Sequence, residues 1–212
     1  MQANLFDDSA DPDQSIRHEL HGSIIQEYPQ AFNTEQADQI LSTLIEVIPW
    51  QQESIRIAGK IIPVPRLQCW MGDRESQYGY SGIRLKPVPW SSEILHIRQR
   101  AEQLAEMKFN SVLINYYRDG NDSVAWHADD EAELGPEAVI ASVSFGAERD
   151  FQLKPKNQAA DVSLRKEMIK LVLRSGSVLV MGKGLQDHWV HQLPKVNNLK
   201  LPRVNLTFRK IL

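Results

Sequence analysis

The sequence is short of the features that would assign it to several common classes of protein. It contains a single cysteine, Cys69, so it can form no intramolecular disulfide and no zinc site built on cysteines. It has no apolar run of about 18 residues and no charged segment followed by an apolar one at its start, so we expect no membrane contact and no export signal. These properties are typical of a reducing compartment, and we expect a cytoplasmic protein.

An excess of basic charge is also missing. The formal net charge is −3 over 212 residues, and the acidic excess falls in the first 20 residues, so the remainder is nearly neutral. Such a balance argues against a general polyanion-binding protein but allows a local basic face. Hydrophobic residues make up 42 % of the chain, which is enough for one well-packed core at this length. We therefore expect one domain and a monomer.

The first 22 residues are polar and acidic and lack periodicity, which predicts a disordered tail (1–22) ahead of a single domain (23–212). Within the tail, the segment Gln2-Ala3-Asn4-Leu5-Phe6 resembles short peptides by which bacterial proteins dock on the replication sliding clamp. The alternative is that these residues pack on the domain. A clamp contact through Gln2–Phe6 is therefore one hypothesis for a partner.

Periodicity in the body of the chain predicts a mainly β protein with flanking helices. Apolar residues at helical spacing predict helices at 34–48 and 92–105, each preceded by a capping residue, Asn33 or Thr34 and Ser91 or Ser92. From residue 111 onward, short alternating or apolar runs predict eight strands, which suggests a sandwich or barrel of the jelly-roll type. The predicted strands are 111–117, 124–129, 138–145, 149–153, 169–173, 177–181, 187–192 and 203–209.

The last predicted strand has an unusual polarity. Successive side chains of a strand point to opposite faces, so Arg203, Asn205, Thr207 and Arg209 share one face. The simplest explanation is an edge strand with one solvated face. The alternative is a polar face that points into the barrel and binds a ligand.

A possible metal site favours the second explanation. His127 and Asp129 lie two residues apart, hence on the same face of an extended segment, and a third ligand could be His188 or His191. Two histidines and one carboxylate form the facial triad of non-haem iron(II) oxygenases, which leaves three coordination positions open. Zinc accepts the same ligands, so the triad alone does not identify the metal.

The two arginines of the last strand favour iron with a 2-oxo acid over a zinc hydrolase. A guanidinium binds a carboxylate through two hydrogen bonds, whereas a hydrolase needs only water at the open metal position. Asn115 and Tyr117 share a face of another predicted strand shortly before His127, and they could form a polar wall beside such a ligand.

Several motifs spread over residues 55–212 support this interpretation. They are Val64-Pro65-Arg66, Gly72-Asp73, Tyr78 to Gly82, Leu113 to Tyr117, His127 to Glu131, Ile140 to Gly146 with Arg149-Asp150-Phe151, His188 to Pro194 and Pro202 to Leu212. Together they resemble the AlkB family of Fe(II)- and 2-oxoglutarate-dependent dioxygenases that dealkylate nucleic acids, especially its duplex-DNA-repairing members. The resemblance implies a double-stranded β-helix (jelly-roll) core at 111–212 and a nucleotide-recognition lid at 54–86.

The resemblance also implies a set of site residues. The iron ligands would be His127, Asp129 and His191, with His188 only a neighbour. The residues matched to 2-oxoglutarate binding are Asn115, Tyr117, Arg203, Asn205, Thr207 and Arg209. Those matched to substrate binding are Tyr78, Gly79, Tyr80, Asp130, Arg66, Glu131, Ala58, Gly59 and Lys60, with Tyr80 stacking on the base and Asp130 near its edge. We expect Arg209 to bind the distal carboxylate of 2-oxoglutarate and Arg203 to lie at the end nearer the metal.

The implied reaction is the oxidative demethylation of 1-methyladenine and 3-methylcytosine in DNA. It needs Fe(II), O₂ and 2-oxoglutarate, with ascorbate as a reductant in vitro, and it yields succinate and formaldehyde. Relatives that act on duplexes carry a bulky aromatic wedge where this chain has Ala58, and alanine cannot fill the gap left by an extracted base. Either Ile57 or Ile61 takes over, or the enzyme prefers single-stranded DNA.

Two other functions remain open at this point. The same iron site could serve a hydroxylase or demethylase of RNA, protein or a small molecule, and the segment 54–86 decides between these substrates. A more remote alternative is a noncatalytic jelly-roll binding module. Iron-dependent succinate formation, abolished by Asp129→Ala, would separate an enzyme from such a module.

Overall fold

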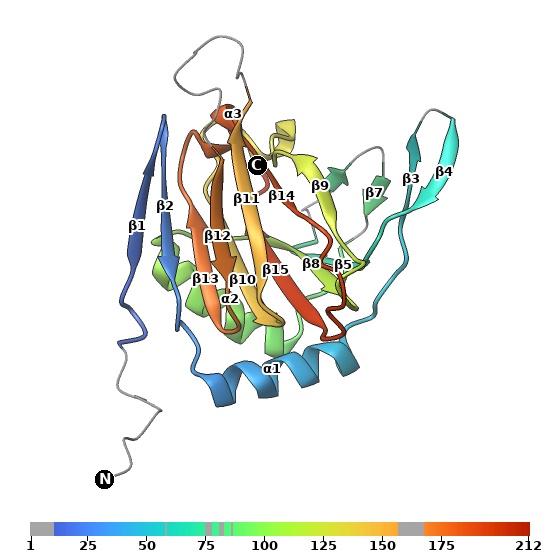
Figure 1. The fold of residues 1–212 in the computed structure, drawn as a ribbon, viewed down its shortest axis with the longest axis horizontal. Coiled ribbons are helices and arrows are strands. Elements are labelled where there is room, and N and C mark those ends of the chain that lie inside the picture. Colours follow the sequence, from blue (N-terminus) through green and yellow to red (C-terminus); the bar gives the residue numbers. More distant parts are fainter. Residues whose placement is uncertain (1–10, 58, 75–77, 81–82, 86, 157–167) are drawn as a thin grey trace.

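The computed structural model describes residues 11–57, 59–74, 78–80, 83–85, 87–156 and 168–212. Two antiparallel sheets lie face to face, and two helices pack on the outer side of the larger one (Figure 1). This arrangement confirms a mainly β fold with flanking helices and a jelly-roll core. The predicted clamp-binding segment Gln2–Phe6 and the hairpin residue Ala58 lie outside the described residues.

The larger sheet has seven strands in the order β1-β2-β13-β10-β15-β8-β5, and the smaller has four in the order β12-β11-β14-β9. The larger consists of β1 (Ile16–Leu20), β2 (Ser23–Tyr28), β5 (Leu67–Gly72), β8 (Ser111–Tyr117), β10 (Ile140–Gly146), β13 (Ser177–Met181) and β15 (Arg203–Arg209). The smaller consists of β9 (Val124–His127), β11 (Arg149–Pro155), β12 (Ile169–Leu173) and β14 (Trp189–Leu193). All eight strands predicted after residue 110 are present, four in each sheet.

Both predicted helices form, with the predicted caps. Helix α1 (Thr34–Val47) begins with a capping box, in which Asn33 and Gln36 each bind the other's backbone N–H through a side-chain oxygen. Helix α2 (Ser92–Ala105) begins at Ser91, whose hydroxyl accepts from the N–H of Ile94. Such caps satisfy N–H groups that the first turn of a helix leaves without partners. Both helices place their apolar stripes on the larger sheet.

Strand β15 is central rather than at an edge. It lies between β10 and β8, and all seven of its residues are buried. Val204, Leu206 and Phe208 join the apolar cluster between the larger sheet and the helices. The polar residues of β15 therefore face the smaller sheet, so the edge-strand explanation of its alternating pattern is wrong.

The predicted tail, residues 1–22, is too long. Residues Ile16–Leu20 form β1, which pairs with β2 along its whole length. Most residues of β1 are exposed, so backbone hydrogen bonds hold this edge strand and little apolar burial contributes. The turn to β2 contains Gly22, whose φ of 72° favours glycine. A polar strand held in this way leaves no apolar period in the sequence.

The predicted lid, residues 54–86, is also too long. Leu67–Gly72 forms β5 of the larger sheet, with Cys69 and Met71 packed toward the helices and Trp70 between the two sheets. Burial on both faces replaces the alternation typical of a half-buried strand. In the predicted strand 187–192, residues 187 and 188 instead end the short helix α3 (Leu185–His188), and β14 starts at Trp189.

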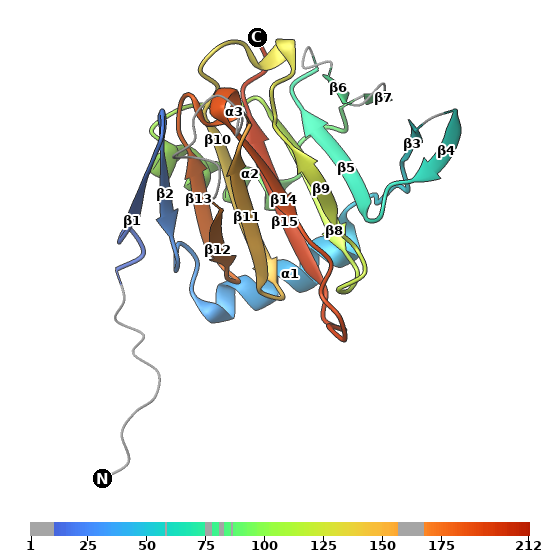
Figure 2. The ribbon, with the colours of Figure 1, turned by 45° about the horizontal axis from the view of Figure 1, so that its top comes forward.

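Two hairpins extend beside β5, away from the body of the sandwich (Figure 2). One is β3 (Ser54–Ile57) with β4 (Lys60–Pro63), and the other is β6 (Tyr78–Tyr80) with β7 (Ile83–Leu85). On β4, Ile61 is 69 % exposed and Ile62 is 41 % exposed. Among the described residues, no helix is long and apolar enough to cross a bilayer.

Candidate metal and cosubstrate site

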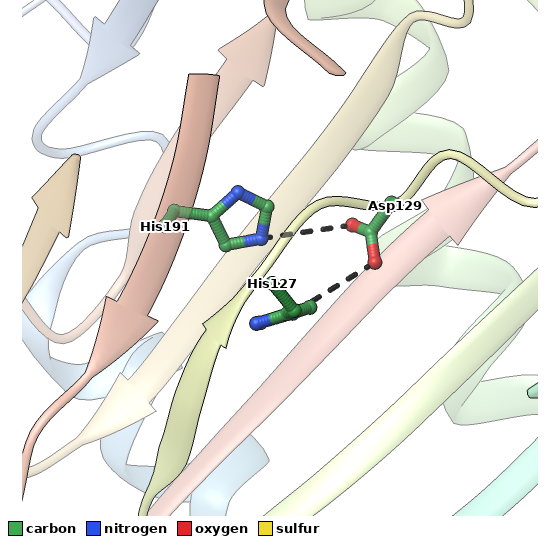
Figure 3. Close-up of side chains that lie close together, drawn as sticks. All are labelled: His127, Asp129 and His191. Carbon is green, nitrogen blue, oxygen red and sulfur yellow. Dashed lines mark ion pairs between the residues drawn. The ribbon is translucent and has the colours of Figure 1, made fainter. Parts of the chain in front are cut away.

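Three predicted metal ligands converge between the sheets (Figure 3). His127 ends β9 and lies directly opposite His191 of the neighbouring strand β14, while Asp129 follows two residues after His127. The Nε2 atom of each histidine lies 3.9 Å from a carboxylate oxygen of Asp129, and one ligand atom from each residue falls within 4.8 Å of the others. These atoms can therefore coordinate a single ion.

The protonation states of His191 and Asp129 suit metal binding. Burial, helped by the charge of His127, lowers the pKa of His191 to about 3, so its imidazole is neutral at physiological pH. Burial would raise the pKa of Asp129, but Arg209 and the two imidazoles lower it to about 2. His127 Nδ1 lies 2.8 Å from the carbonyl oxygen of Ala125, to which it donates in the neutral tautomer, leaving the Nε2 lone pair for a metal.

Asp129 is held from two sides. Arg209 Nη2 donates to its Oδ1 over 2.8 Å, and the Asp129 backbone N–H donates to Gln186 Oε1 over 2.9 Å. Gln186 is buried on α3, and no motif in the sequence pointed to it. Sequence reasoning missed this residue because α3 was not predicted.

The expected roles of the two arginines of β15 are reversed. Arg209, not Arg203, contacts a metal ligand, so the expectation that Arg203 lies at the end nearer the metal is wrong. The two side chains share one face of a seven-residue strand, which places Arg203 at the far end of the same pocket. Arg203 is therefore the candidate for the distal carboxylate of 2-oxoglutarate.

Arg203 has the properties expected of an anion-binding residue. It is only 2 % exposed, and burial lowers its pKa to about 10, although Tyr117 opposes this effect. Its Nη2 donates to Ser144 Oγ over 3.0 Å and its guanidinium lies 5.1 Å from the centre of the Tyr117 ring. Its Nε has no acceptor, and no carboxylate pairs with it in the described part of the chain. A buried cation in a pocket without a counterion fits a carboxylate ligand.

The polar wall beside Arg203 contains two asparagines with different roles. Asn205 uses its amide nitrogen on Ser142 Oγ and the Val143 carbonyl, at 2.8 and 2.9 Å, and its oxygen accepts from Thr207. These bonds tie Asn205 to the neighbouring strand β10. Asn115 of β8 lies directly opposite Asn205. Its amide oxygen accepts hydrogen bonds from Arg66 and Gln68.

One cavity unites the predicted metal and cosubstrate residues. All nine line it, and Arg66 lines it as well. Apolar side chains such as Leu113 and Phe151 complete the wall and limit the access of water. The predicted residues on this wall are His127, Asp129, His191, Asn115, Tyr117, Arg203, Asn205, Thr207 and Arg209. His188 lies outside it, packed against His21 and Gly22.

The predicted substrate residues are more dispersed. Arg66 is buried and its Nε donates to Asn115 Oδ1. Asp130 is exposed and pairs with Lys156 over 2.6 Å, and Glu131 follows it in sequence, at the start of the 3₁₀ helix η1 (Ala132–Leu134). Gly59 and Lys60 lie at the tip of the β3–β4 hairpin, and Tyr78, Gly79 and Tyr80 form β6. Their contacts with a base remain predictions.

Comparison with known proteins agrees with this geometry. A family model described as the 2OG-Fe(II) oxygenase superfamily matches residues 25–209. DNA oxidative demethylase ALKBH2 of Homo sapiens is 41 % identical over 189 residues, which cover 87 % of this chain and 72 % of that protein. Alpha-ketoglutarate-dependent dioxygenase alkB homolog 3 of Mus musculus is 40 % identical over 188 residues, which cover 87 % of this chain and 65 % of that protein.

A solved structure supports the fold. The structure of OsALKBH1 superimposes with a TM-score of 0.60 and covers 92 % of this chain and 100 % of its own, at 16 % sequence identity. At that identity the likeness concerns the fold alone. It agrees with the two-sheet core that holds the pocket.

Proposed function

Because this chain belongs to the AlkB family within the 2OG-Fe(II) oxygenase superfamily, we propose that it oxidatively removes alkyl groups from N-alkylated bases in DNA. Membership of the superfamily makes it an Fe(II)- and 2-oxoglutarate-dependent dioxygenase. The relatives named DNA oxidative demethylase, at about 40 % identity, support DNA as the substrate. The favoured lesions are 1-methyladenine and 3-methylcytosine.

The observation that carries the proposal is the set of residues that line the pocket between the sheets. A metal triad and a buried arginine that pairs with no carboxylate of the described residues line the same cavity, so one pocket offers both metal ligands and a site for a carboxylate. A hydrolytic zinc site does not need this second subsite, in which an arginine binds an anion. The donor set therefore fits iron with 2-oxoglutarate.

The residues of the chain divide the work of the reaction. When bound, iron and dioxygen supply the oxidation of the N-methyl carbon, coupled to decarboxylation of 2-oxoglutarate to succinate. His191 offers a neutral nitrogen ligand, His127 offers its Nε2 atom, and Arg209 keeps Asp129 ionised. Arg203 and Asn115 would orient the cosubstrate, and the apolar wall keeps water from the reaction. The hydroxylated methyl group then leaves as formaldehyde and the unmodified base remains.

Base extraction is the other task of the protein. An alkylated base that pairs badly costs less to unstack, which favours lesions that block pairing. Both favoured lesions are cationic, and Asp130 supplies an exposed carboxylate near the metal ligands. The β3–β4 hairpin offers the exposed apolar side chains of Ile61 and Ile62, which could occupy the gap in the duplex.

Repair of defined oligonucleotides tests the proposal. Single- and double-stranded DNA carrying 1-methyladenine or 3-methylcytosine, and matched RNA, would be incubated with Fe(II), 2-oxoglutarate, O₂ and ascorbate. Mass spectrometry should detect the unmodified base together with succinate and formaldehyde, and Asp129→Ala should abolish all three products. Succinate formation without repair of any oligonucleotide would point to a protein or small-molecule substrate. No succinate from the wild type would favour a noncatalytic module.

Two finer elements accompany this proposal. We expect a monomer that acts in the cytoplasm, and we expect Gln2–Phe6 to contact the sliding clamp. A pull-down with purified clamp, compared between wild type and a Leu5→Ala, Phe6→Ala variant, tests the contact. Equal recovery of clamp in both would contradict it.

A further inference from the structure

The carboxamide oxygen of Asn115 is the focus of a buried hydrogen-bond cluster. Arg66 Nε donates to Asn115 Oδ1 over 2.7 Å, and Gln68 Nε2 donates to the same atom over 2.9 Å. All three side chains are buried, and Gln68 is only 3 % exposed. Gln68 belongs to β5 and lies directly opposite Asn115 on β8, so the sheet register brings the two amides together.

Two donors occupy both acceptor positions of an amide oxygen. The Asn115 nitrogen, with its two N–H groups, must therefore point away from β5. The reversed amide would set this nitrogen against two other donors and leave buried polar groups without partners, which is strongly unfavourable. The orientation of the Asn115 carboxamide is thus determined by its neighbours.

Asn115 lines the same pocket as Arg203 and lies two residues along β8 from Tyr117, which is directly opposite Arg203. Its partner across the sheet, Asn205, has its amide nitrogen bound to Ser142 and Val143 and cannot donate freely to a ligand. Asn115 is therefore the better neutral donor for an anion next to Arg203. A second donor beside a guanidinium adds geometric selectivity for a carboxylate.

Arg66 also connects the cluster to β9, the strand that ends at the metal ligand His127. Its Nη1 donates to the Ser123 carbonyl over 3.1 Å, and the Ser123 N–H donates back to the Pro65 carbonyl over 3.0 Å. Ser123 directly precedes β9, which ends at His127. These contacts hold Arg66, predicted as a substrate residue, in the buried pocket wall next to Asn115.

We propose that Gln68 and Arg66 are positioning residues that hold the Asn115 carboxamide so that its N–H groups face the carboxylate of 2-oxoglutarate at Arg203. The inference rests on the use of this cosubstrate in the proposed function. Neither residue belongs to the metal triad. Their effect should therefore appear in the affinity for 2-oxoglutarate and not in metal binding.

Substitutions at Gln68 test the inference. In Gln68→Glu, the carboxylate accepts from the Asn115 amide and draws its nitrogen away from the pocket. In Gln68→Met, one donor is lost and the volume is nearly kept. We expect Kd for 2-oxoglutarate, measured by calorimetry on the Mn²⁺-loaded protein without nucleic acid, to rise about 10-fold or more for Glu and about threefold for Met, as expected for lost buried hydrogen bonds. Mn²⁺ affinity should stay unchanged.

A double-mutant cycle separates positioning from general damage. In the Asn115→Leu background, Gln68→Met should cause no further loss of 2-oxoglutarate affinity, because its effect passes through Asn115. Gln152→Met is the matched control: it breaks a 2.7 Å bond between Gln192 and Gln152, neither of which lines the pocket. This control should leave Kd unchanged.

Two results would overturn the inference. One is an unchanged Kd in folded Gln68→Met, and the other is an equal loss from this substitution with and without Asn115. Thermal melting shows whether each variant folds. If the buried carboxylate of Gln68→Glu prevents folding, Gln68→Met alone tests the inference. A wild type that binds 2-oxoglutarate but repairs no methylated DNA would refute the proposed substrate and leave the positioning role standing.

Discussion

Replacing Arg203 with methionine should make the protein more stable and unable to use 2-oxoglutarate. The guanidinium is 2 % exposed and lacks a counterion among the described residues. The fall of its pKa from the ordinary value of an arginine to about 10 corresponds to a cost of about 3 kcal/mol for burying the charge. The variant also loses the hydrogen bond from Arg203 to Ser144, which lowers its stability by about 1 kcal/mol. We expect a net gain of about 2 kcal/mol, or roughly 4–8 °C in Tm for a domain of this size.

Cosubstrate binding should change in the opposite direction. Removing one partner of a buried, hydrogen-bonded charge pair costs about 2–5 kcal/mol. The affinity of Arg203→Met for 2-oxoglutarate should therefore fall by about 30-fold or more. In thermal melts with Mn²⁺, 2-oxoglutarate should raise the Tm of the wild type and leave that of the variant nearly unchanged.

Arg149 provides a matched control, because it is equally buried at 2 % exposure but has backbone partners. Its guanidinium donates to the carbonyls of Asp119, Asp122 and Pro194 at 3.4, 2.9 and 2.6 Å. Arg149→Met leaves these acceptors without their donor, at about 1 kcal/mol or more each. It should lower the Tm. The reasoning fails if both variants lower the Tm alike, or if 2-oxoglutarate stabilises Arg203→Met as much as the wild type.

Three further predictions concern pH, lesion charge and duplex preference. The metal-free protein should lose stability as the pH falls from about 6.5 toward 3, because His191 takes up a proton in the unfolded chain but not in the folded one. The free energy of unfolding should fall by about 2 kcal/mol at pH 5. Urea unfolding at several pH values measures it, and a flat profile above pH 5 contradicts it. Lys156→Gln removes the cation paired with Asp130 and should raise the preference for cationic over neutral lesions about two- to fivefold, which is the energetic scale of an exposed ion pair. An unchanged ratio of turnover on cationic to neutral lesions refutes the role of the pair. Ile61→Ser should reduce turnover on duplex relative to single-stranded DNA, whereas Ala58→Phe should increase it; unchanged ratios in both would exclude the hairpin as the wedge.

The sequence predicted those parts of the fold whose side chains follow a period. Helices α1 and α2 bury an apolar stripe, and strands such as β11 alternate between buried and half-buried residues. A regular spacing of apolar residues indicates that one face of the helix or strand is packed and the other is solvated. Strand β15 also alternates, but both of its faces are buried, and only the metal triad indicated that its polar face points inward.

The missed elements have no such period. Strand β1 is held by its backbone, and β5 is buried on both faces, so neither alternates between apolar and polar residues. Helix α3 has four residues, which is too short for a helical pattern, yet it supplies Gln186 to Asp129. Side-chain identity does not reveal contacts of this kind, which depend on how distant segments meet.

Strand periodicity could not predict which of the two residues, Arg203 or Arg209, lies beside the metal ligands. A period of two assigns both arginines to one face but does not say which end of the strand meets the metal. The loop after Asp129 decides this, because the Leu212 N–H donates to the Glu133 carbonyl over 2.9 Å and ties that loop to the C-terminus. Arg209 lies three residues before Leu212 and contacts Asp129, whereas Arg203 lies at the opposite end of the pocket and pairs with no carboxylate in the part of the chain that the structure describes. The C-terminal residues therefore help to place Arg209, and not Arg203, beside Asp129. Deleting Ile211 and Leu212 should accordingly weaken metal binding more than it weakens 2-oxoglutarate binding.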